Sequence, residues 1–283
     1  MITRDLKWGT PVPVDKFKDK VFYVWFDAPI GYISITANYI DEWKQWWQNE
    51  KNVELYQFMG KDNTTFHTVI FPSTLIGSEQ PWTKLKQIST TEFLNYEIDP
   101  DTGKPLKFSK TRGTGVFGDD AMKTGIASEV WRYFLLINRP ENQDTVFTWD
   151  DFKAKNNNEL LKNLGNFSNR ALKFTVSAFE SVVPEYGAAE FQGKDAEFTT
   201  ELLKKFEEYH SLMEAVKLKD SLRIAMAYSS DCNLYFQENE PWVLAKSDKA
   251  RCKQVVNTAL NALFLLCVML EPFMPSFSAK IYE

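Results

Sequence analysis

Two lysines three positions apart lie in a short segment bordered by glycines. Lys107 and Lys110 belong to the heptapeptide Lys-Phe-Ser-Lys-Thr-Arg-Gly, which follows Gly103 and precedes Gly115. Glycine adopts backbone conformations that other residues avoid, so such a loop can fold closely over a ligand. Ammonium groups on flexible stems suit phosphate binding. The segment therefore predicts a triphosphate-binding loop, although exposed loops with a few lysines also occur in proteins without such a site.

The elements that must position this loop alternate between strands and helices. We expect strands at 21–27, 54–59 and 88–93, helices at about 33–49 and 64–75, and a turn at 99–103. This alternation favours a mostly parallel, doubly wound (Rossmann-like) sheet. Ligands bind such sheets at the carboxyl ends of their strands. The lysine segment follows the last expected strand and the turn, as this rule requires.

The second half of the chain predicts helices. Beyond about residue 117 we expect no further strands, and apolar residues recur with helical spacing at 202–216 and 252–270. We expect breaks at 184–193, near Lys219 and at 239–241, where Pro241 suits the first turn of a helix. The predicted fold class is α/β plus all-α. Its parts are a partial catalytic fold at 1–116, a helical connection at 117–150 and an antiparallel helix bundle at 151–283.

Composition narrows the function classes. The 283 residues are enough for two domains, and the net charge of −5 lacks the basic excess that is typical of nucleic-acid-binding proteins. RNA can still be bound, because unstacked bases are read by stacking and hydrogen bonding. No apolar run approaches the roughly 18 residues that span a bilayer, and the start resembles neither a signal nor a transit peptide. We expect a cytoplasmic protein without a membrane partner.

The cysteines indicate reduced thiols. None of the three forms a Cys-x-x-Cys pair, and all lie in the helical half. With the two histidines so far away, they cannot form a zinc site, so we expect no structural zinc and no metal ligands in this chain. The predicted buried thiols are Cys232, Cys252 and Cys267.

Several blocks of sequence resemble the methionyl-tRNA synthetases, a family of class I aminoacyl-tRNA synthetases. The blocks are Arg-Asp-Leu-Lys-Trp-Gly at 4–9, Val-Trp-Phe-Asp-Ala-Pro-Ile-Gly-Tyr at 24–32, Gly-Lys-Asp at 60–62 with Phe-His at 66–67, and the lysine segment. They occur in the order that the family shows. Asn-Leu-Gly-Asn at 163–166, Asn-Arg at 169–170 and Glu-Pro-Trp-Val-Leu-Ala-Lys at 240–246 resemble its anticodon-binding helices. The chain thus resembles the eukaryotic cytoplasmic type of this family.

The resemblance implies roles for individual residues. In the lysine loop, Lys110 would stabilise the departing pyrophosphate and Lys107 would support it. The resemblance implies an apolar slot for the methionine side chain, formed by Trp25, Ala28, Pro29, Tyr32 and His67. It implies ATP binding by Gly60, Asp62, Lys107, Ser109 and Lys110. In the bundle it implies anticodon binding by Asn166, Arg170 and Trp242.

The implied activity is that of a methionine–tRNA ligase. L-Methionine is activated with ATP and Mg²⁺ to methionyl adenylate and then transferred to tRNA(Met), so the implied partners are methionine, ATP and tRNA(Met). The family's His-x-Gly-His motif and connective domain are missing from the sequence. We therefore expect a fragment with little activation activity by itself. A missing upstream half or a multi-synthetase assembly would be a further partner.

Competing interpretations remain at this stage. The chain could be a non-catalytic tRNA-binding module in which the sheet is only a scaffold. A class I synthetase for leucine, isoleucine, valine or cysteine would share the lysine loop. The run at 28–32 and the implied anticodon-binding residues Asn166, Arg170 and Trp242 disfavour that interpretation. Taken singly, Trp25 could be a core residue and His67 a structural histidine. Asp62 could be a helix cap, and Trp242 could be a packing residue that closes the bundle.

Overall fold

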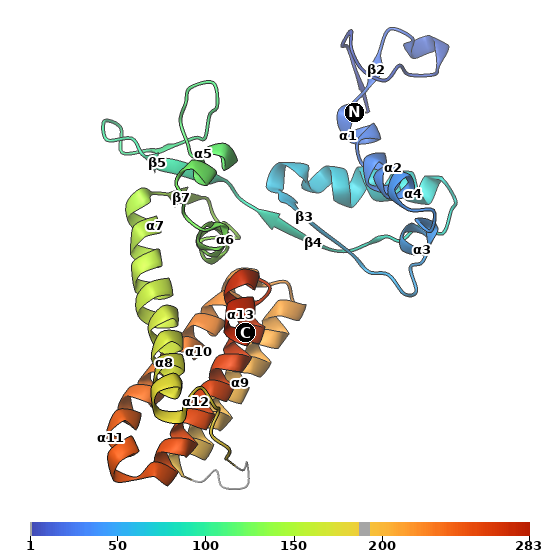
Figure 1. Ribbon diagram of the computed structural model, residues 1–283. Helices are drawn as coiled ribbons and strands as arrows, with labels where there is room; N and C mark the ends of the chain where they lie inside the picture. Colours follow the sequence, from blue (N-terminus) through green and yellow to red (C-terminus); the bar gives the residue numbers. More distant parts are fainter. Residues whose placement is uncertain (1, 187–192) are drawn as a thin grey trace. The chain divides into compact units, whose positions relative to one another are not determined.

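The computed structural model describes residues 2–186 and 193–283 (Figure 1). The chain divides into two compact units. The first unit runs up to Phe93 and includes Glu141–Gln143, and the second comprises Leu94–Pro140 and Asp144–Glu283.

The first unit contains two pairs of strands. Strand β1 (Thr3–Arg4) pairs antiparallel with β2 (Val21–Phe22), and a 3₁₀ turn, η1 (Asp15–Phe17), lies between them in sequence. Strand β3 (Leu55–Gly60) pairs parallel with β4 (Leu85–Thr91). The strands expected at 54–59 and 88–93 are confirmed to within a few residues, and their parallel pairing is that of a doubly wound sheet.

The strand expected at 21–27 is wrong beyond Phe22. Residues Val24–Asp27 form a helical turn, α1, and helix α2 (Ile30–Tyr39) follows it. Pro29 precedes α2 with φ −61° and ψ −24°, so the proline that was interpreted as ending a strand leads into a helix instead. Helix α2 stops at Ile40, which is extended, and the rest of the predicted helix is reduced to α3 (Lys44–Trp47).

The helix expected at 64–75 is present between β3 and β4. It consists of a 3₁₀ turn, η2 (Lys61–Asn63), a π-helical segment, η3 (Phe66–Ile70), and helix α4 (Phe71–Gly77). Pro72 lies in the first turn of α4, where the missing N–H group costs little. This connection places His67 just beyond the carboxyl end of β3.

The second unit begins with a small mixed sheet. Strand β5 (Leu94–Ile98) pairs antiparallel with β6 (Pro105–Leu106) and parallel with β7 (Thr145–Phe147), and helices α5 (Gly118–Lys123) and α6 (Ser128–Ile137) connect β6 to β7. The expected turn at 99–103 is present, with Gly103 at φ +66°. The expectation of no strand beyond residue 117 is wrong, because β7 is stabilised by pairing with β5 and by burial of Phe147.

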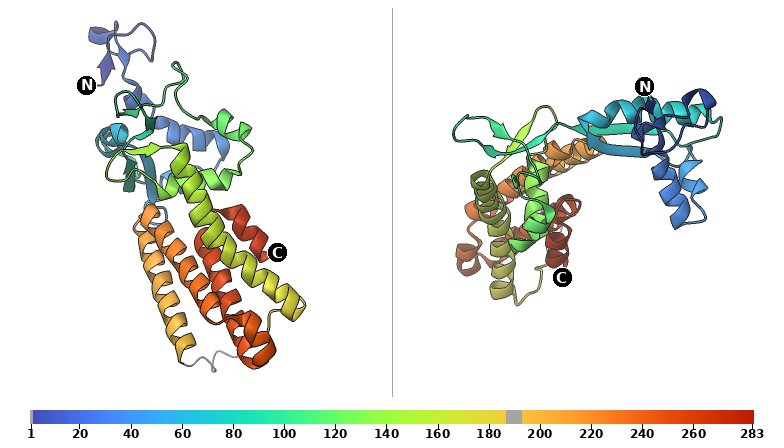
Figure 2. Two further views of the ribbon diagram at one scale, coloured as in Figure 1. Left: turned by 90° about the vertical axis from the view of Figure 1, so that its left-hand side faces the viewer. Right: turned by 90° about the horizontal axis from the view of Figure 1, so that it is seen from above.

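Helices form the rest of the second unit, as predicted. A continuous helical stretch comprises α7 (Trp149–Lys155), the π-helical segment η4 (Asn156–Gly165) and α8 (Asn166–Phe179). The following helices are α9 (Lys194–Glu214), α10 (Leu218–Glu238), α11 (Pro241–Ser247), α12 (Lys249–Leu270) and α13 (Pro275–Tyr282). Helices α9, α10 and α12 lie side by side (Figures 1 and 2). Pro241 begins α11 as expected, and the break at 184–193 lies partly outside the described residues.

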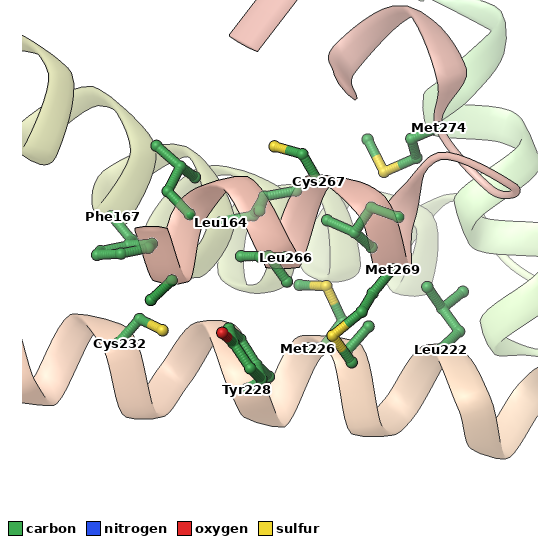
Figure 3. Close-up of a cluster of buried hydrophobic side chains, with 14 of the residues drawn as sticks. Leu164, Phe167, Leu222, Met226, Tyr228, Cys232, Leu266, Cys267, Met269 and Met274 are labelled. Atoms are coloured by element: carbon green, nitrogen blue, oxygen red, sulfur yellow. The ribbon is translucent and has the colours of Figure 1, made fainter. Parts of the chain in front are cut away.

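Helix α12 forms the centre of the bundle. The apolar face predicted at 252–270 is buried throughout, and Figure 3 shows Leu266 and Met269 of α12 facing Tyr228 and Met226 of α10. All three cysteines are buried and free, as predicted. Contrary to the sequence-based expectation, α12 is long and apolar enough to cross a membrane by length and composition. Of its most apolar window, 61% is buried inside the protein, which is typical of a core helix.

A buried ion pair joins the ends of three helices. Asp195 of α9, with a side chain only 1% exposed, accepts hydrogen bonds from both terminal nitrogens of Arg251 on α12 and from the hydroxyl of Tyr235 on α10. Arg251 also donates to Oδ1 of Asn239 at 2.6 Å. The carboxylate therefore holds α9, α10 and α12 together at one end of the bundle.

We predict that Asp195→Ala lowers the free energy of unfolding by about 3–5 kcal/mol, because Arg251 and Tyr235 lose their buried partner. Urea unfolding followed by circular dichroism measures the change. The matched control is Glu201→Ala on the same helix, which removes the exposed ion pair with Lys204 and is expected to leave the unfolding midpoint unchanged. Equal midpoints for the two variants would contradict a stabilising role for the buried pair.

Candidate functional site

An aromatic cluster surrounds His67 in the first unit. The ring of His67 lies 5.3 Å from the ring of Trp25 and 5.7 Å from that of Tyr32, measured between centroids. Phe66 stacks on Trp25 at 5.6 Å, and Phe71 meets Tyr32 edge-on at 6.0 Å. Helices α1 and α2, segment η3 and helix α4 each contribute a ring. The structure thus brings together three of the residues predicted to bind the methionine side chain.

The hydrogen bonds of His67 define its tautomer. Nδ1 lies 2.8 Å from the carbonyl oxygen of Asn63, and Nε2 lies 2.8 Å from the hydroxyl of Tyr32. Because a carbonyl oxygen can only accept, Nδ1 carries the proton. In the neutral ring Nε2 is then the acceptor, and the Tyr32 hydroxyl donates to it. These bonds fix both rings in place.

The cluster reaches the surface through Tyr32. His67 is 1% exposed, whereas Tyr32 is 38% exposed. Ala28 and Pro29 lie at the junction of α1 and α2, one turn before Tyr32. A part-buried polar pair with aromatic walls and one open side suits an apolar ligand with a weakly polar atom, such as a thioether. The contacts of His67 also fit the alternative of a structural histidine, so the binding role stays a prediction.

Gly60 and Asp62 lie at the carboxyl end of β3, where a doubly wound sheet binds its ligands. Gly60 has extended dihedral angles, φ −72° and ψ 151°, and an added Cβ would meet no atom within 4 Å. The fold of this chain therefore does not itself require glycine there, and close approach of a ligand remains its predicted role. Asp62 is exposed. The N-cap of η3 is Thr65, and it makes no side-chain capping hydrogen bond.

The lysine loop is a tight hairpin in the second unit. Ser109 and Thr114 exchange two backbone hydrogen bonds of 2.8 and 3.0 Å, and Gly113 donates to the carbonyl of Lys110 at 3.2 Å. Gly113 has φ +64°, which favours glycine at this turn. At Gly115, with φ +132°, a Cβ would lie 2.4 Å from the Phe108 ring. The glycines are thus required for this hairpin.

Phe108 anchors the loop, whereas its lysines are exposed. The Phe108 ring contacts Tyr96 of β5 at 5.4 Å and Phe117 at 6.1 Å, within an aromatic cluster that also includes Phe147. The ammonium of Lys110 lies 5.5 Å from the Phe117 ring centre, a cation–π contact. The loop therefore has a fixed base and presents cations at its tip.

Parallel helices α8 and α10 are joined by polar side chains, which we call the amide ladder. In each hydrogen-bonded pair, or rung, the two residues are 67 positions apart in the sequence. Because this separation is constant, the two helices run in the same direction. The rungs are Asn163–Ser230 at 2.8 Å, Asn166–Asn233 at 3.2 Å and Arg170–Gln237 at 2.8 Å. The first rung comes from η4, immediately before α8.

Trp242 lies beside the last rung. The guanidinium carbon of Arg170 is 5.1 Å from the Trp242 ring centre and 5.6 Å from that of Phe236. Trp242 is 36% exposed and follows Pro241 at the start of α11. The structure therefore brings together all three predicted anticodon-binding residues. Trp242 also contacts the Phe236 ring edge-on at 6.4 Å, which fits a packing role for Trp242.

Sequence reasoning missed the partners on α10. The groove beside the ladder is lined by Asn166 and Arg170, but also by Asn233 and Gln237. A signal was available, because Ser230, Asn233 and Gln237 repeat the three- and four-residue steps of Asn163, Asn166 and Arg170. Periodicity identifies each polar face, but it does not say that the two faces meet.

The predicted nucleotide site is divided between the two units. Gly60, Asp62 and the His67 cluster belong to the first, and the lysine loop belongs to the second. Among residues 2–186 and 193–283, no three His, Cys, Asp or Glu side chains are grouped closely enough to hold a metal ion.

Comparison with known proteins covers both units. Residues 1–172 match the family model for class I tRNA synthetases of the methionyl type, and residues 183–283 match the anticodon-binding domain of methionyl tRNA ligase. A solved Mycobacterium tuberculosis methionyl-tRNA synthetase in complex with methionyl-adenylate has the same fold, with a TM-score of 0.78 at 24% identity over 99% of this chain and 53% of that one. The fold and the family match are those of a class I tRNA synthetase.

Curated relatives identify the branch of class I synthetases to which the chain is similar. The chain is 56% identical to the probable cytoplasmic methionine–tRNA ligase of Dictyostelium discoideum, 54% to the cytoplasmic enzyme of Arabidopsis thaliana and 49% to that of Homo sapiens. These matches cover 99–100% of this chain but only 37%, 35% and 30% of the respective relatives. The chain belongs to the methionyl family of class I tRNA synthetases, and it spans about a third of the length of these relatives.

We predict that His67 occurs as the Nδ1–H tautomer. In ¹⁵N-detected NMR, Nε2 should show the shift of an unprotonated ring nitrogen and Nδ1 that of a protonated one. The only other histidine of the chain, His210, is exposed on α9 and serves as the internal control. An Nε2–H tautomer at His67 would exclude the hydrogen bond to the Asn63 carbonyl.

Proposed function

We propose that the chain provides the carboxyl-terminal part of the catalytic fold and the anticodon-binding bundle of a methionine–tRNA ligase. The enzyme activates L-methionine with ATP to methionyl adenylate and transfers the methionine to tRNA(Met). The observation that carries the proposal is the family match, which runs through both the His67 cluster and the amide ladder. The cytoplasmic names of the relatives support a cytoplasmic location.

The His67 cluster would bind the methionine side chain. Trp25, Ala28 and Pro29 provide apolar walls, and the fixed Tyr32–His67 pair offers polar atoms to the thioether. Contacts between sulfur and aromatic rings contribute only about 0.3–1.5 kcal/mol each, so selection depends on several contacts and on exclusion of branched or larger side chains.

The proposed ATP contacts come from the carboxyl end of β3 and from the lysine loop. Asp62 and the backbone at Gly60 would contact the ribose, while Lys107, Ser109 and Lys110 would contact the phosphates. Attack of the methionine carboxylate on the α-phosphate increases negative charge on the phosphate oxygens, and positioned cations stabilise that charge. Mg²⁺ bound to ATP would supply further positive charge. The exposure of the Lys110 side chain, whose ammonium lies over the Phe117 ring, supports this role.

The bundle would read the anticodon of tRNA(Met). A splayed base can stack on Trp242, and Asn166 and Arg170 can contact the edges of unstacked bases. We propose the division predicted from sequence, with the catalytic part at 1–116, a connection at 117–150 and the anticodon-binding part at 151–283. An upstream segment or a multi-synthetase assembly remains a proposed partner.

A non-catalytic tRNA-binding module is the second candidate. It is favoured by one observation, namely that residues 183–283 by themselves match the anticodon-binding domain of methionyl tRNA ligase. The two candidates share the anticodon site and differ in whether the lysine loop performs chemistry.

We predict that Lys110→Ala lowers methionine-dependent ATP–pyrophosphate exchange by about 100- to 1000-fold, the effect of removing one charge-stabilising group. The assay uses the full chain, alone and mixed with the part of the Dictyostelium relative that it does not cover. Lys104→Ala, in the exposed turn between β5 and β6, is the control and should keep full activity. Unchanged exchange in Lys110→Ala, or no exchange in any mixture, would favour the non-catalytic module.

We predict that Trp242→Ala weakens binding of the tRNA(Met) anticodon stem-loop by about 5- to 150-fold, because stacking on one aromatic ring is worth roughly 1–3 kcal/mol per base. Fluorescence anisotropy of a labelled stem-loop measures the affinity. Trp46→Ala, which removes an exposed tryptophan of the first unit, is the control. Equal affinities of the two variants would argue that Trp242 only packs the bundle.

A further inference from the structure

We propose that Asn233 is a positioning residue that determines which end of the Asn166 amide faces the anticodon. The inference rests on the proposed function and adds the direction of the hydrogen bond that Asn166 offers. An asparagine amide presents a donor at one end and an acceptor at the other, so its orientation decides which base edge it can bind.

The orientation originates at a backbone group. The carbonyl of Met226 on α10 accepts a 2.9 Å hydrogen bond from Asn163, and a carbonyl can only accept. Nδ2 of Asn163 must therefore face Met226, and its Oδ1 is turned the other way. Ser229 donates to that Oδ1 at 2.9 Å, which supports the same orientation.

Asn233 then has one acceptable orientation. Its Nδ2 lies 2.7 Å from the backbone carbonyl of Asn163 and 3.1 Å from Oδ1 of the same residue. The reversed amide would place its oxygen against two acceptor oxygens, and this repulsive contact is unfavourable in this half-buried position. Oδ1 of Asn233 therefore points toward α8.

Asn166 takes its orientation from Asn233. Its Nδ2 donates to Oδ1 of Asn233 at 3.2 Å. Its own Oδ1 has no hydrogen-bond partner among the described residues, and Asn166 is exposed where two grooves adjoin. The structure thus presents a hydrogen-bond acceptor to a ligand.

An acceptor at this position selects bases with an amino group at C4 of a pyrimidine or at C6 of a purine. Cytosine and adenine carry such a donor, whereas uracil and guanine carry a carbonyl oxygen at the corresponding position. The methionine anticodon, CAU, has amino groups on its first two bases. Asn233 would therefore favour the cognate anticodon without touching it.

The experiment compares anticodon stem-loops with CAU, UAU and CGU, because each change puts a carbonyl oxygen in place of the amino group at C4 of the first base or C6 of the second. Fluorescence anisotropy measures their affinities for the full chain and for its variants Asn233→Leu, Asn233→Asp and Asn166→Asp/Asn233→Leu. The readout is the affinity for CAU divided by that for the weaker of the other two, so a uniform effect of added charge cancels. Asn261→Asp on α12 is the control for charge, because among the described residues its amide bonds only to Asn257 of the same helix.

We expect a ratio of about tenfold or more in the unmodified chain and below about threefold in Asn233→Leu, in which the Asn166 amide can turn. Asn233→Asp should keep the ratio, since a carboxylate still accepts from Nδ2 of Asn166. The double variant should regain it, because an aspartate at 166 presents an acceptor in either orientation. A merely structural role predicts instead that aspartate, beside the Asn163 carbonyl, is at least as harmful as leucine.

The inference is overturned if Asn233→Leu keeps the ratio, if Asn233→Asp loses it, or if the unmodified chain does not discriminate. If circular dichroism shows that Asn233→Leu is unfolded, Asn233→Asp decides: a retained ratio supports the inference and a lost ratio overturns it. Failure of the unmodified chain to bind any stem-loop would instead overturn the proposed function, and this inference with it.

Discussion

The burial of helix α12 is the constraint on which the second unit depends. Its side chains are apolar over most of the circumference, so the helix must be surrounded, and α8, α9, α10, α11 and α13 all contact it. Fully burying one leucine or valine side chain contributes about 1.5–3 kcal/mol, so this helix provides a large share of the stabilising free energy. Because α8 and α10 both pack on α12, their polar edges are held against each other. The amide ladder is thus a consequence of core packing.

The sequence predicts best the elements that are long and carry a repeated apolar pattern. The apolar face of α12 and the break at Pro241 agree with the structure, because a helix of this length repeats its pattern many times. Short elements carry no such pattern. Strand β7 has three residues and exists because β5 pairs with it, and the run at 21–27 is β-branched and aromatic yet turns helical after Phe22. At both segments the tertiary surroundings, rather than the local secondary-structure propensity, determine the conformation of the chain.

The predicted sites show the same division between local and long-range information. Trp25, Tyr32 and His67 do meet around one buried imidazole, and Asn166, Arg170 and Trp242 gather at one end of the bundle. The motifs contained the identities of these residues but not their partners. Asn233 could not be assigned to Asn166 beforehand, since α9 intervenes in the sequence and either face of α10 could have met α8. The hydrogen bonds that orient each functional side chain come from residues outside the motifs.

The length of the π-helical segment η4 determines which side of α8 faces α10. The segment runs without a break from α7 into α8, so its residue count determines the rotation of α8 about its own axis. Each residue of an α-helix advances the chain by about 100° and 1.5 Å. Removing a single residue from this stretch would turn the polar edge of α8 away from α10 while leaving its helical character intact. Length variation between sequences should therefore be far less tolerated between Asn156 and Gly165 than in the loops that join the other helices.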